Sequence, residues 1–409
     1  MIHLYDVPLA FALVGLALYT VLGGADFGAG FWQLVAGRGE RGREIRDHAH
    51  HAMGPVWEAN HVWLVFVLTV MWTAYPTAFA SIASTLSVPL FVAGLGIVLR
   101  GGAYALRSGT VSPREQRLVD TVFAVSSVLT PFALGTAVGG VASGRVHVGN
   151  PGGSVLTSWL NATSIMTGLL GTAFAAYNAA VFLSGDARRD GNEELAERFR
   201  RRALGAGLVA GAAAFAGLGV LRADDHHLFT RLATGSGLAA VVLSVAAGVG
   251  TLALIYVRRY EPARYTSAVA VAAIIGGWAV AQNPVLIRGL TIHDAAAGRD
   301  TLVALVVAVV AGGALVFPSL TLLFRLTLGG RLRGDALIPG AVIRPRGPHT
   351  RRSTLPAAAL LVAGIGFLTV ADAAWAHAIG VTALLLFVAV AFRSVALEDE
   401  DTASVGDPA

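Results

Sequence analysis

Long apolar runs, interrupted by few polar residues, dominate the hydrophobic pattern of this chain. A helix that crosses a bilayer needs about 20 consecutive, mostly apolar residues. Runs of this kind begin near Val7, Ala52, Thr77, Leu118, Ser158, Ala203, Gly237, Tyr265 and Leu302. The pattern predicts an all-α, polytopic membrane protein with about nine transmembrane helices, which we expect to form two four-helix bundles plus a peripheral helix.

Arginine is concentrated in alternate linkers between these runs. The linkers after the first, third, fifth, seventh and ninth runs are rich in arginine, whereas those near Pro76 and Asn150 carry almost none. Short linkers rich in arginine stay on the cytoplasmic side of a membrane. We therefore expect the N-terminus outside and the odd-numbered linkers inside. No basic segment precedes the first run and no small-residue cleavage site follows it, so we expect it to be retained as a span.

The end of the chain departs from this pattern. Residues 1–328 hold the nine runs, and residues 329–353 form a basic stretch that we expect to be a cytoplasmic loop. A further apolar stretch over residues 354–393, broken by the sequence ADAAWAH, predicts an extra transmembrane hairpin of two short helices. Residues 394–409 are acidic, which predicts a disordered tail.

The amino-acid composition is that of a protein embedded in the lipid bilayer. Hydrophobic residues make up 55% of the 409 and charged residues 13%, and the mean hydropathy is +0.67, values far from those of a soluble domain. The net charge of +5 comes from arginine alone, because the chain contains no lysine, and we expect no nucleic-acid binding. The lack of cysteine excludes disulfides and thiolate metal sites.

Three ionisable residues interrupt the first three runs at similar depth. The second run enters from the cytoplasmic side near Ala52, which puts Glu58 roughly 10 Å inside. Asp26, in the sequence GGADFGAG, lies roughly 15 Å from the same side. Arg100 comes a couple of turns before the cytoplasmic end of the third run. We expect the three to converge near the inner leaflet, where each charge needs a partner, water or a task.

Two interpretations of this cluster remain open. In the first, it is a proton route, because membrane-buried carboxylates in series are what a relay needs. His61 lies one turn after Glu58 on the same helical face and would share its proton. In the second, the residues are structural. Asp26 then pins a glycine-broken helix, Arg100 snorkels to the head groups, and Glu58 is neutral and hydrogen-bonded.

The histidine positions argue against a haem or metal ion bound by this chain alone. A transmembrane bis-histidine haem needs imidazoles at matching depth on facing helices, and only His61 lies inside one of the nine runs. Other histidines lie at the boundary of the second run or in an outer linker: His48, His50, His51, His226 and His227. The boundary histidines adjoin Asp47, but such an interfacial polar run is typical of a solvated surface, and we expect no metal there.

Several motifs, taken together, resemble subunit II of the cytochrome bd family of quinol oxidases. They are GGADFGAG in the first run, GPVWEANHVWLV in the second, AYPTAFA at the next turn and LRGGAYALR at the end of the third. Gly54, Pro55, Trp57 and Asn60 belong to the second of these motifs. The segments WAVAQNPVLI and LTIHDAAAG are similar to the cyanide-insensitive branch of the family. The resemblance covers approximately residues 1–328, and the remaining segment has no counterpart in it.

The resemblance implies a heterodimer with a haem-bearing subunit I in the inner membrane of a bacterium. In that family, subunit I carries haems b and d, or b only, together with the loop that oxidises quinol. The complex oxidises quinol on the outer side and reduces oxygen to water with protons drawn from the cytoplasm. Subunit II then contributes a scaffold and access for protons and oxygen. The resemblance also leaves room for a structural quinone and for a small single-span subunit.

The resemblance assigns roles to individual residues. Glu58 matches the acidic position of the family's cytoplasmic proton channel, and Asp26 and Arg100 match polar positions of the same helices. Trp63 matches the aromatic residue beside the proposed lateral entry for oxygen. One position departs from the family, which usually has a second acidic residue five positions after the arginine, where this chain has Ala105. Water, a group of subunit I or another proton source would have to fill that place.

Two other functions stay open at this stage. One is a purely structural or assembly subunit, in which case mutation of Glu58 leaves turnover unchanged. The other is a secondary transporter, in which glycine-broken helices such as VLGGADFGAG line a substrate site at the midplane. The polar cluster lies near one face of the membrane and the two halves show no clear repeat, and both observations argue against a transporter.

Overall fold

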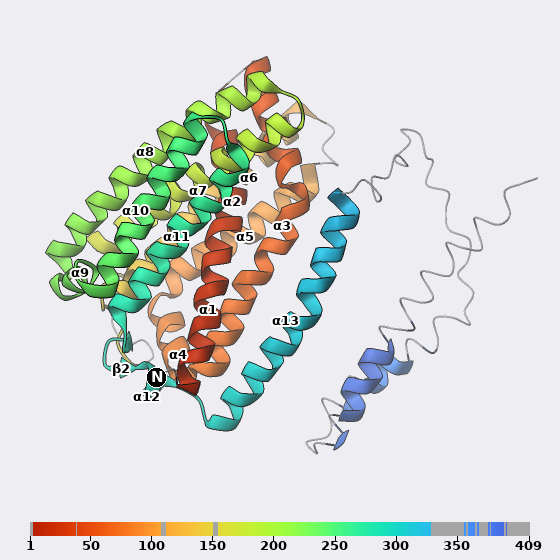
Figure 1. Cartoon of the computed structure of the whole chain (residues 1–409). Coiled ribbons are helices and arrows are strands. Elements are labelled where there is room, and N and C mark those ends of the chain that lie inside the picture. Colours follow the sequence, from red (N-terminus) through yellow and green to blue (C-terminus); the bar gives the residue numbers. More distant parts are fainter. Residues whose placement is uncertain are drawn as a thin grey trace, which may run out of the picture. The chain divides into compact units, whose positions relative to one another are not determined.

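The computed structural model describes residues 3–37, 39–107, 112–149 and 154–328, and then 356, 359–364, 366–367, 375–376, 378–387 and 390. The side chains of residues 51–59, 113, 317 and 320–328 lie outside this description, although their backbone is helical. Contacts divide the chain into two units, Met1–Leu320 and Thr321–Ala409. The first unit is built almost entirely of α-helices (Figure 1).

The predicted spans are present among the described residues. Eight helices are long and apolar enough to cross a membrane, and the apolar half of a ninth, Asn60–Ala74, lies in α3. The all-α, polytopic fold class is therefore confirmed. The spans are formed by α1 (Val7–Leu18) with η2 (Tyr19–Gly23) and α2 (Gly24–Leu34), α3 (Glu40–Ala74), α5 (Ser87–Arg107), α6 (Pro113–Ala142), α7 (Ala162–Arg189), α8 (Glu193–Asp224), α10 (Gly235–Tyr256), α11 (Tyr260–Gln282) and α13 (Arg299–Leu328).

Two of the predicted spans are interrupted. The first contains the π-helical turn η2 between α1 and α2, a widened turn of the kind found mostly as single insertions within α-helices. The third is divided into α4 (Pro76–Thr85) and α5, with Leu86 between them. Pro89 explains this break, because a proline ring clashes with the carbonyl group four residues earlier, here that of Thr85.

Short elements that the hydrophobic pattern did not predict lie at the end of the first unit that holds the N-terminus of the chain (Figure 1). The strands β1 (Val285–Ile287) and β2 (Leu290–Thr291) pair antiparallel. Next to them, the Arg288 backbone N–H donates to the carbonyl oxygen of Val146 (3.1 Å). The remaining short elements are η1 (Leu4–Asp6), α9 (His226–Leu232) and α12 (Ile292–Ala295).

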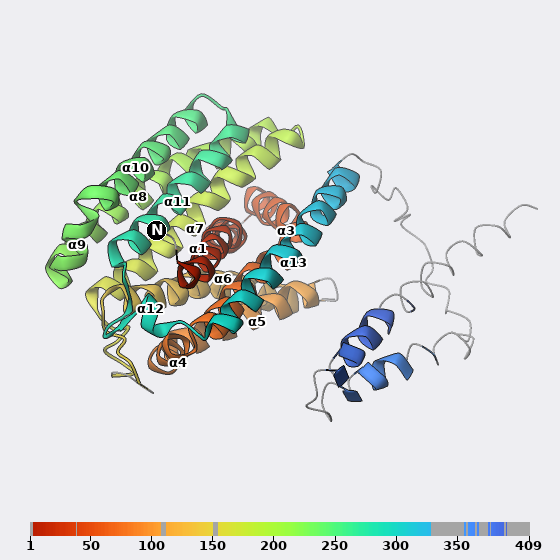
Figure 2. The same ribbon diagram turned by 60° about the horizontal axis from the view of Figure 1, so that its bottom comes forward.

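The spans form the two expected bundles. Helices α1 to α3, α5 and α6 make the first bundle, and α7, α8, α10 and α11 make the second (Figures 1 and 2). Helix α7 joins them, because it packs on α2 and α6 as well as on α8. Helix α13 is the peripheral helix. Leu302, near its start, is buried in an apolar cluster with Tyr75 and Ile287 at the end of the first unit that holds the N-terminus of the chain.

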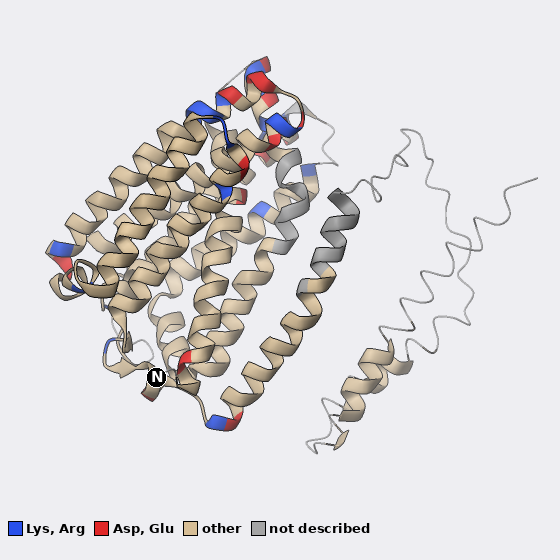
Figure 3. Cartoon of the chain, in the orientation of Figure 1, with Lys and Arg blue, Asp and Glu red and all other residues tan. Residues whose placement is uncertain are grey.

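Charged residues gather at one end of the first unit, away from the N-terminus (Figure 3). We call this the arginine-rich end; it holds the connections between α2 and α3, α5 and α6, α7 and α8, and α10 and α11. Ion pairs tie these connections together, among them Arg198 to Glu44 (2.8 Å) and Arg264 to Asp186 (2.8 Å). Within the described residues, the arginine clusters that follow the first, third, fifth and seventh runs therefore lie on one side of the bundle.

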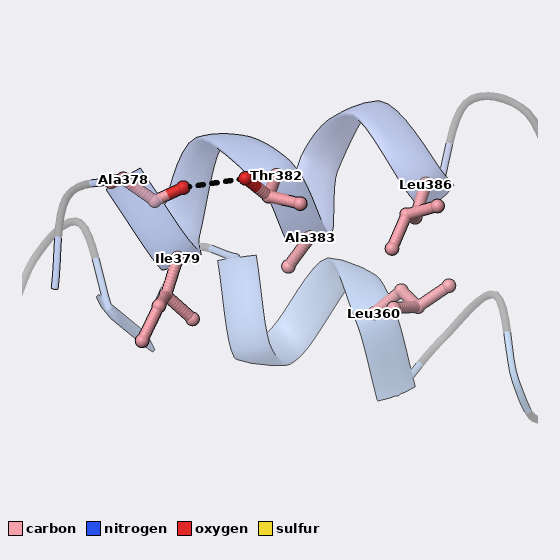
Figure 4. A pocket seen from close by; sticks show the side chains of 6 residues that line it. All are labelled: Leu360, Ala378, Ile379, Thr382, Ala383 and Leu386. Carbon is pink, nitrogen blue, oxygen red and sulfur yellow. Dashed lines mark hydrogen bonds between the residues drawn. The ribbon is translucent and has the colours of Figure 1, made fainter. Parts of the chain in front are cut away.

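The second unit contains the segment predicted as an extra hairpin. Its described part includes the apolar helix Ala378–Phe387. A Cβ added at Gly364 would lie 2.6 Å from the Leu384 side chain, so two helical segments pack closely there. They border a small apolar hollow (Figure 4), in which the Thr382 hydroxyl donates to the Ala378 carbonyl oxygen (2.8 Å). The predicted loop 329–353 and tail 394–409 lie outside the described residues, and the transmembrane hairpin stays a prediction.

Candidate functional site

A buried ion pair joins the first and third spans. Arg100 of α5 donates through Nη1 to Asp26 Oδ2 and through Nη2 to Asp26 Oδ1, both at 2.6 Å. Nη2 also donates to the backbone oxygen of Asp26 (3.0 Å), and Nε donates to Ser127 Oγ of α6 (2.9 Å). Each of the paired side chains is only 1% exposed. Arg100 therefore does not snorkel to the head groups; the carboxylate of Asp26 neutralises its charge within the bundle.

Close helix packing brings these groups together. A Cβ at Gly28 would lie 1.8 Å from the Ala175 carbonyl oxygen of α7, and one at Gly30 would lie 2.2 Å from Ser127 Oγ. Only glycine allows α2 to approach α6 and α7 this closely. The GGADFGAG sequence thus supplies both the carboxylate and the small residues that let it reach Arg100.

Aromatic rings enclose the ion pair. The Arg100 guanidinium carbon lies 4.5 Å from the centre of the Phe123 ring and 5.1 Å from that of Phe27, within the range of cation–π attraction. The Phe27 ring also contacts the rings of Tyr19 and His61, each at a centroid distance of 6.4 Å. Phe27 therefore links Arg100 to the histidine of α3.

Helix α3 contributes the other predicted residues. Asn60 is fully buried and donates from Nδ2 to the Leu22 carbonyl oxygen of η2 (3.1 Å). Trp63 is partly exposed and packs against the cluster of Tyr19 and Phe27. The side chains of Pro55, Trp57 and Glu58 lie outside the description, and nothing beyond the helical backbone is described for Gly54. The structure thus brings Asp26, Arg100, His61, Asn60 and Trp63 into one region, and the role of Glu58 stays a prediction.

A second contact between α5 and α6 lies closer to the arginine-rich end. Arg107 Nε lies 3.1 Å from Asp120 Oδ1, and Arg107 Nη2 lies 3.5 Å from Asp47 Oδ1 of α3. Arg107 follows Arg100 by seven residues, and Asp120 precedes Ser127 by seven, so the two contacts form parallel rungs roughly 10 Å apart along the helices. Ala105 lies between the two rungs in sequence.

Sequence reasoning missed the contribution of α6 to this site. Asp120, Phe123 and Ser127 recur at helical spacing, which puts them on one face. This spacing was a usable signal. The register of α6 against α5, which decides that Asp120 meets Arg107, was not readable from the chain.

The boundary histidines have structural contacts. His48 Nε2 lies 3.2 Å from the Leu183 carbonyl oxygen, and its Nδ1 lies 3.9 Å from Asp190. The His50 ring lies 4.9 Å from that of Tyr104. Within the described part of the chain, no three His, Asp or Glu side chains are grouped as a metal would require. Among the described apolar stretches that could cross a membrane, His61 in Asn60–Ala74 is the only imidazole, so these stretches do not supply the two ligands that a bis-histidine haem on this chain alone would need.

The fold and this site define a polytopic, all-helical membrane protein with an ion pair buried between its first and third spans. A family model described as "Cytochrome bd terminal oxidase subunit II" matches residues 4–327. The chain belongs to this family. The match also ends close to the last residue of α13.

Individual relatives agree with this assignment. The chain is 25% identical over 239 residues to the cytochrome bd ubiquinol oxidase subunit 2 of Bacillus subtilis (strain 168), covering 56% of this chain and 66% of that protein. It is 26% identical over 134 residues to the cytochrome bd-I ubiquinol oxidase subunit 2 of Escherichia coli (strain K12), covering 32% of this chain and 35% of that protein. The matched regions thus span just under two thirds of the first relative and about a third of the second.

A solved structure extends the likeness to most of the chain. The structure of bd oxidase from Geobacillus thermodenitrificans contains a chain similar to this one, with a TM-score of 0.61 and 25% sequence identity. The similarity covers 80% of this chain and 99% of that chain.

Proposed function

We propose that this chain is the haem-free subunit of a bd-type terminal oxidase, which oxidises quinol and reduces oxygen to water. The partner, subunit I, would hold the haems and the quinol site, and this chain would provide a scaffold together with access for protons and oxygen. Membership of the family supports this division of roles, as does the finding that His61 is the only imidazole in the described apolar stretches that could cross a membrane. Family membership also argues against the secondary transporter.

The proposed orientation has the arginine-rich end in the cytoplasm. Its ion-paired connections carry the arginine clusters, and arginine-rich loops stay on the cytoplasmic side of a membrane. The N-terminus, at the other end of the first span, then faces outward. Protons for oxygen reduction would enter at the arginine-rich end.

The proton proposal rests on the two contacts between α5 and α6, Arg100 with Ser127 and Arg107 with Asp120. Asp120 and Asp47 meet Arg107 at the arginine-rich end, and their side chains are 24% and 52% exposed. We propose that these partly exposed carboxylates take up protons from water in place of the acidic residue that the family has at the position of Ala105. From there the proposed path runs along α3 through Glu58 and His61.

A specific observation favours the structural alternative. Asp26 accepts from Arg100 with both carboxylate oxygens, and the arginine also donates to Ser127 Oγ and to the Asp26 backbone oxygen. Such a set of contacts holds α2, α5 and α6 together. The scaffold function therefore rests on Asp26 and Arg100, and the relay proposal rests on Glu58, His61 and the entrance carboxylates.

The two functions are separated by turnover of the purified complex. We would purify the complex through a tag on this chain and measure its reduced-minus-oxidised spectrum and quinol-dependent oxygen uptake. Glu58→Gln and Asp120→Asn should lower uptake with an unchanged haem spectrum, Glu58→Gln on the order of a hundredfold. Glu40→Gln is the matched control, because Glu40 is exposed at the start of the same helix α3. Normal uptake in Glu58→Gln would leave only the scaffold function.

Oxygen access is proposed at Trp63. This side chain is partly exposed on α3 and packs beside Tyr19 and Phe27. If oxygen enters there, Trp63→Phe should change the KM for oxygen and leave the quinol KM unchanged. Equal constants for both substrates in the variant and the wild type would remove this proposal.

A further inference from the structure

Three buried polar side chains lie in or beside the π-helical turn η2, which begins at Tyr19. Tyr19 is 5% exposed, and Asn60 and Asn178 are fully buried. The Tyr19 hydroxyl, Asn60 Oδ1 and both side-chain polar atoms of Asn178 have no hydrogen-bond partner in the described part of the protein. Nearly all buried polar groups in proteins are paired with protein or with ordered water.

These groups converge on the residues where η2 passes into α2. Asn60 Nδ2 donates to the Leu22 carbonyl oxygen from α3, which leaves Oδ1 of the same amide available. The Tyr19 ring lies against Gly23, with Cε2 3.2 Å from the position of an added Cβ. Asn178 reaches Gly24 from α7, with Nδ2 3.6 Å from the corresponding position. Two amides and one phenol thus border one turn of the first span.

Gly24 leaves room beside the Asn178 amide. An added Cβ there would meet only Asn178 Nδ2 at 3.6 Å and Ala175 Cα at 3.7 Å, both ordinary van der Waals distances. A gap that would admit a methyl group and that faces an unpaired amide suits a water molecule. Buried water usually makes about three hydrogen bonds, and Asn178, Asn60 and Tyr19 each have an unpaired polar atom that water near this turn would satisfy.

We propose that η2, Asn60 and Asn178 form a buried hydration site that holds ordered water inside the first bundle and at its contact with α7. The Tyr19 ring lies 6.4 Å from the His61 ring, so water at this site lies next to the histidine of the proposed relay. Its use in proton transfer rests on the proposed function; the presence of water does not.

The site is tested by cryo-electron microscopy of the complex at a resolution that shows ordered water. We expect density within hydrogen-bond distance of the Asn178 amide in the wild type and its loss in Gly24→Ala, whose methyl group fills the gap. Gly94→Ala is the matched control, because a Cβ at Gly94 of α5 meets nothing within 4 Å. A dry gap, or an Asn178 amide bonded directly to another protein group, overturns the proposal.

Asn178→Leu provides a second test that does not depend on density. An unpaired buried amide destabilises a protein, so its replacement by an apolar side chain of similar size would raise the melting temperature of the complex. A hydrated amide predicts no such rise, and a clear rise contradicts the site. Turnover separates this proposal from the relay. If the gap is dry and Glu58→Gln is defective in turnover, only the proposal of a hydration site is contradicted. If water density is clear and Glu58→Gln is fully active, only the proposal of a proton relay is contradicted.

Discussion

Arg100 and Asp26 form a two-point ion pair across the interface of α5 and α2, with both N–O distances at 2.6 Å and both side chains 1% exposed. The contact fixes the third span against the glycine-rich part of the first. The two opposite charges offset each other inside the bundle.

Breaking this pair from one side should destabilise the complex strongly. Arg100→Gln leaves the Asp26 carboxylate buried without its counter-charge, which costs about 3–5 kcal/mol. We expect a lower melting temperature and a lower yield of assembled complex. The double variant Asp26→Leu with Arg100→Met removes both charges and should recover part of the loss. A double variant no more stable than Arg100→Gln would contradict the pairing.

The hydroxyl of Ser127 should contribute more to the stability of the protein than the hydroxyl of Ser126. Ser127→Ala removes the acceptor for Arg100 Nε and leaves a charged donor unpaired, which costs about 1.5–3 kcal/mol. Ser126→Ala is the control, because Ser126 is equally buried but bonds only to carbonyl oxygens of its own helix. Thermal unfolding of the two purified variants gives the comparison, and equal melting temperatures would speak against the role assigned to Ser127.

The contact of α2 with α7 should depend on Gly28. Gly28→Ala places a methyl carbon 1.8 Å from the Ala175 carbonyl oxygen, so one helix must shift. Overpacking of this kind costs about 1–3 kcal/mol or more. Gly94→Ala, on an open face of α5, should behave as the wild type. Size-exclusion chromatography of the tagged complex measures assembly; full assembly of Gly28→Ala would show that α7 lies farther from α2.

The cap of α12 should loosen in acid. Hydrogen bonds from Thr291, and then the contact with His293, hold the pKa of the Asp294 carboxyl below its ordinary value. A lowered pKa in the folded state stabilises the cap above the ordinary pKa, and this contribution is lost as the pH falls through the folded value. Relative to Asp294→Asn, the Ile292–Ala295 amides should therefore be protected near neutral pH and lose that advantage below about pH 4. Hydrogen exchange, corrected for intrinsic rates, tests this; a difference that persists in acid would contradict it.

Much of the fold was predictable from the chain because bilayer thickness fixes helix length. The runs beginning near Val7 and Leu302 are recovered as spans, since a helix in hydrocarbon must satisfy its own backbone. The π-helical turn at Tyr19–Gly23 and the break at Leu86 were missed. Both are local departures from a regular helix that leave the average hydropathy of the span unchanged.

The candidate site was predictable only in part. Helix depth alone put Asp26 and Arg100 at similar levels, and the structure has them in contact. The depth of a residue in the membrane does not give the rotation of its helix or the register of that helix against its neighbours. The contacts of Ser127 and Asp120 of α6 with the arginines of α5 were therefore not predicted. Asn178 was also missed, because a lone amide in an apolar helix carries no signal until its neighbours in space are known.

Proton uptake by the oriented complex tests the central claim most directly. With the complex in sealed vesicles and the arginine-rich end facing the interior, oxygen reduction should take up protons from the interior, measured with a trapped pH dye. The account predicts that Glu58→Gln abolishes this uptake while the haem spectrum stays unchanged, and that Glu40→Gln takes up protons as the wild type does. Unchanged uptake in Glu58→Gln would contradict proton access through this subunit.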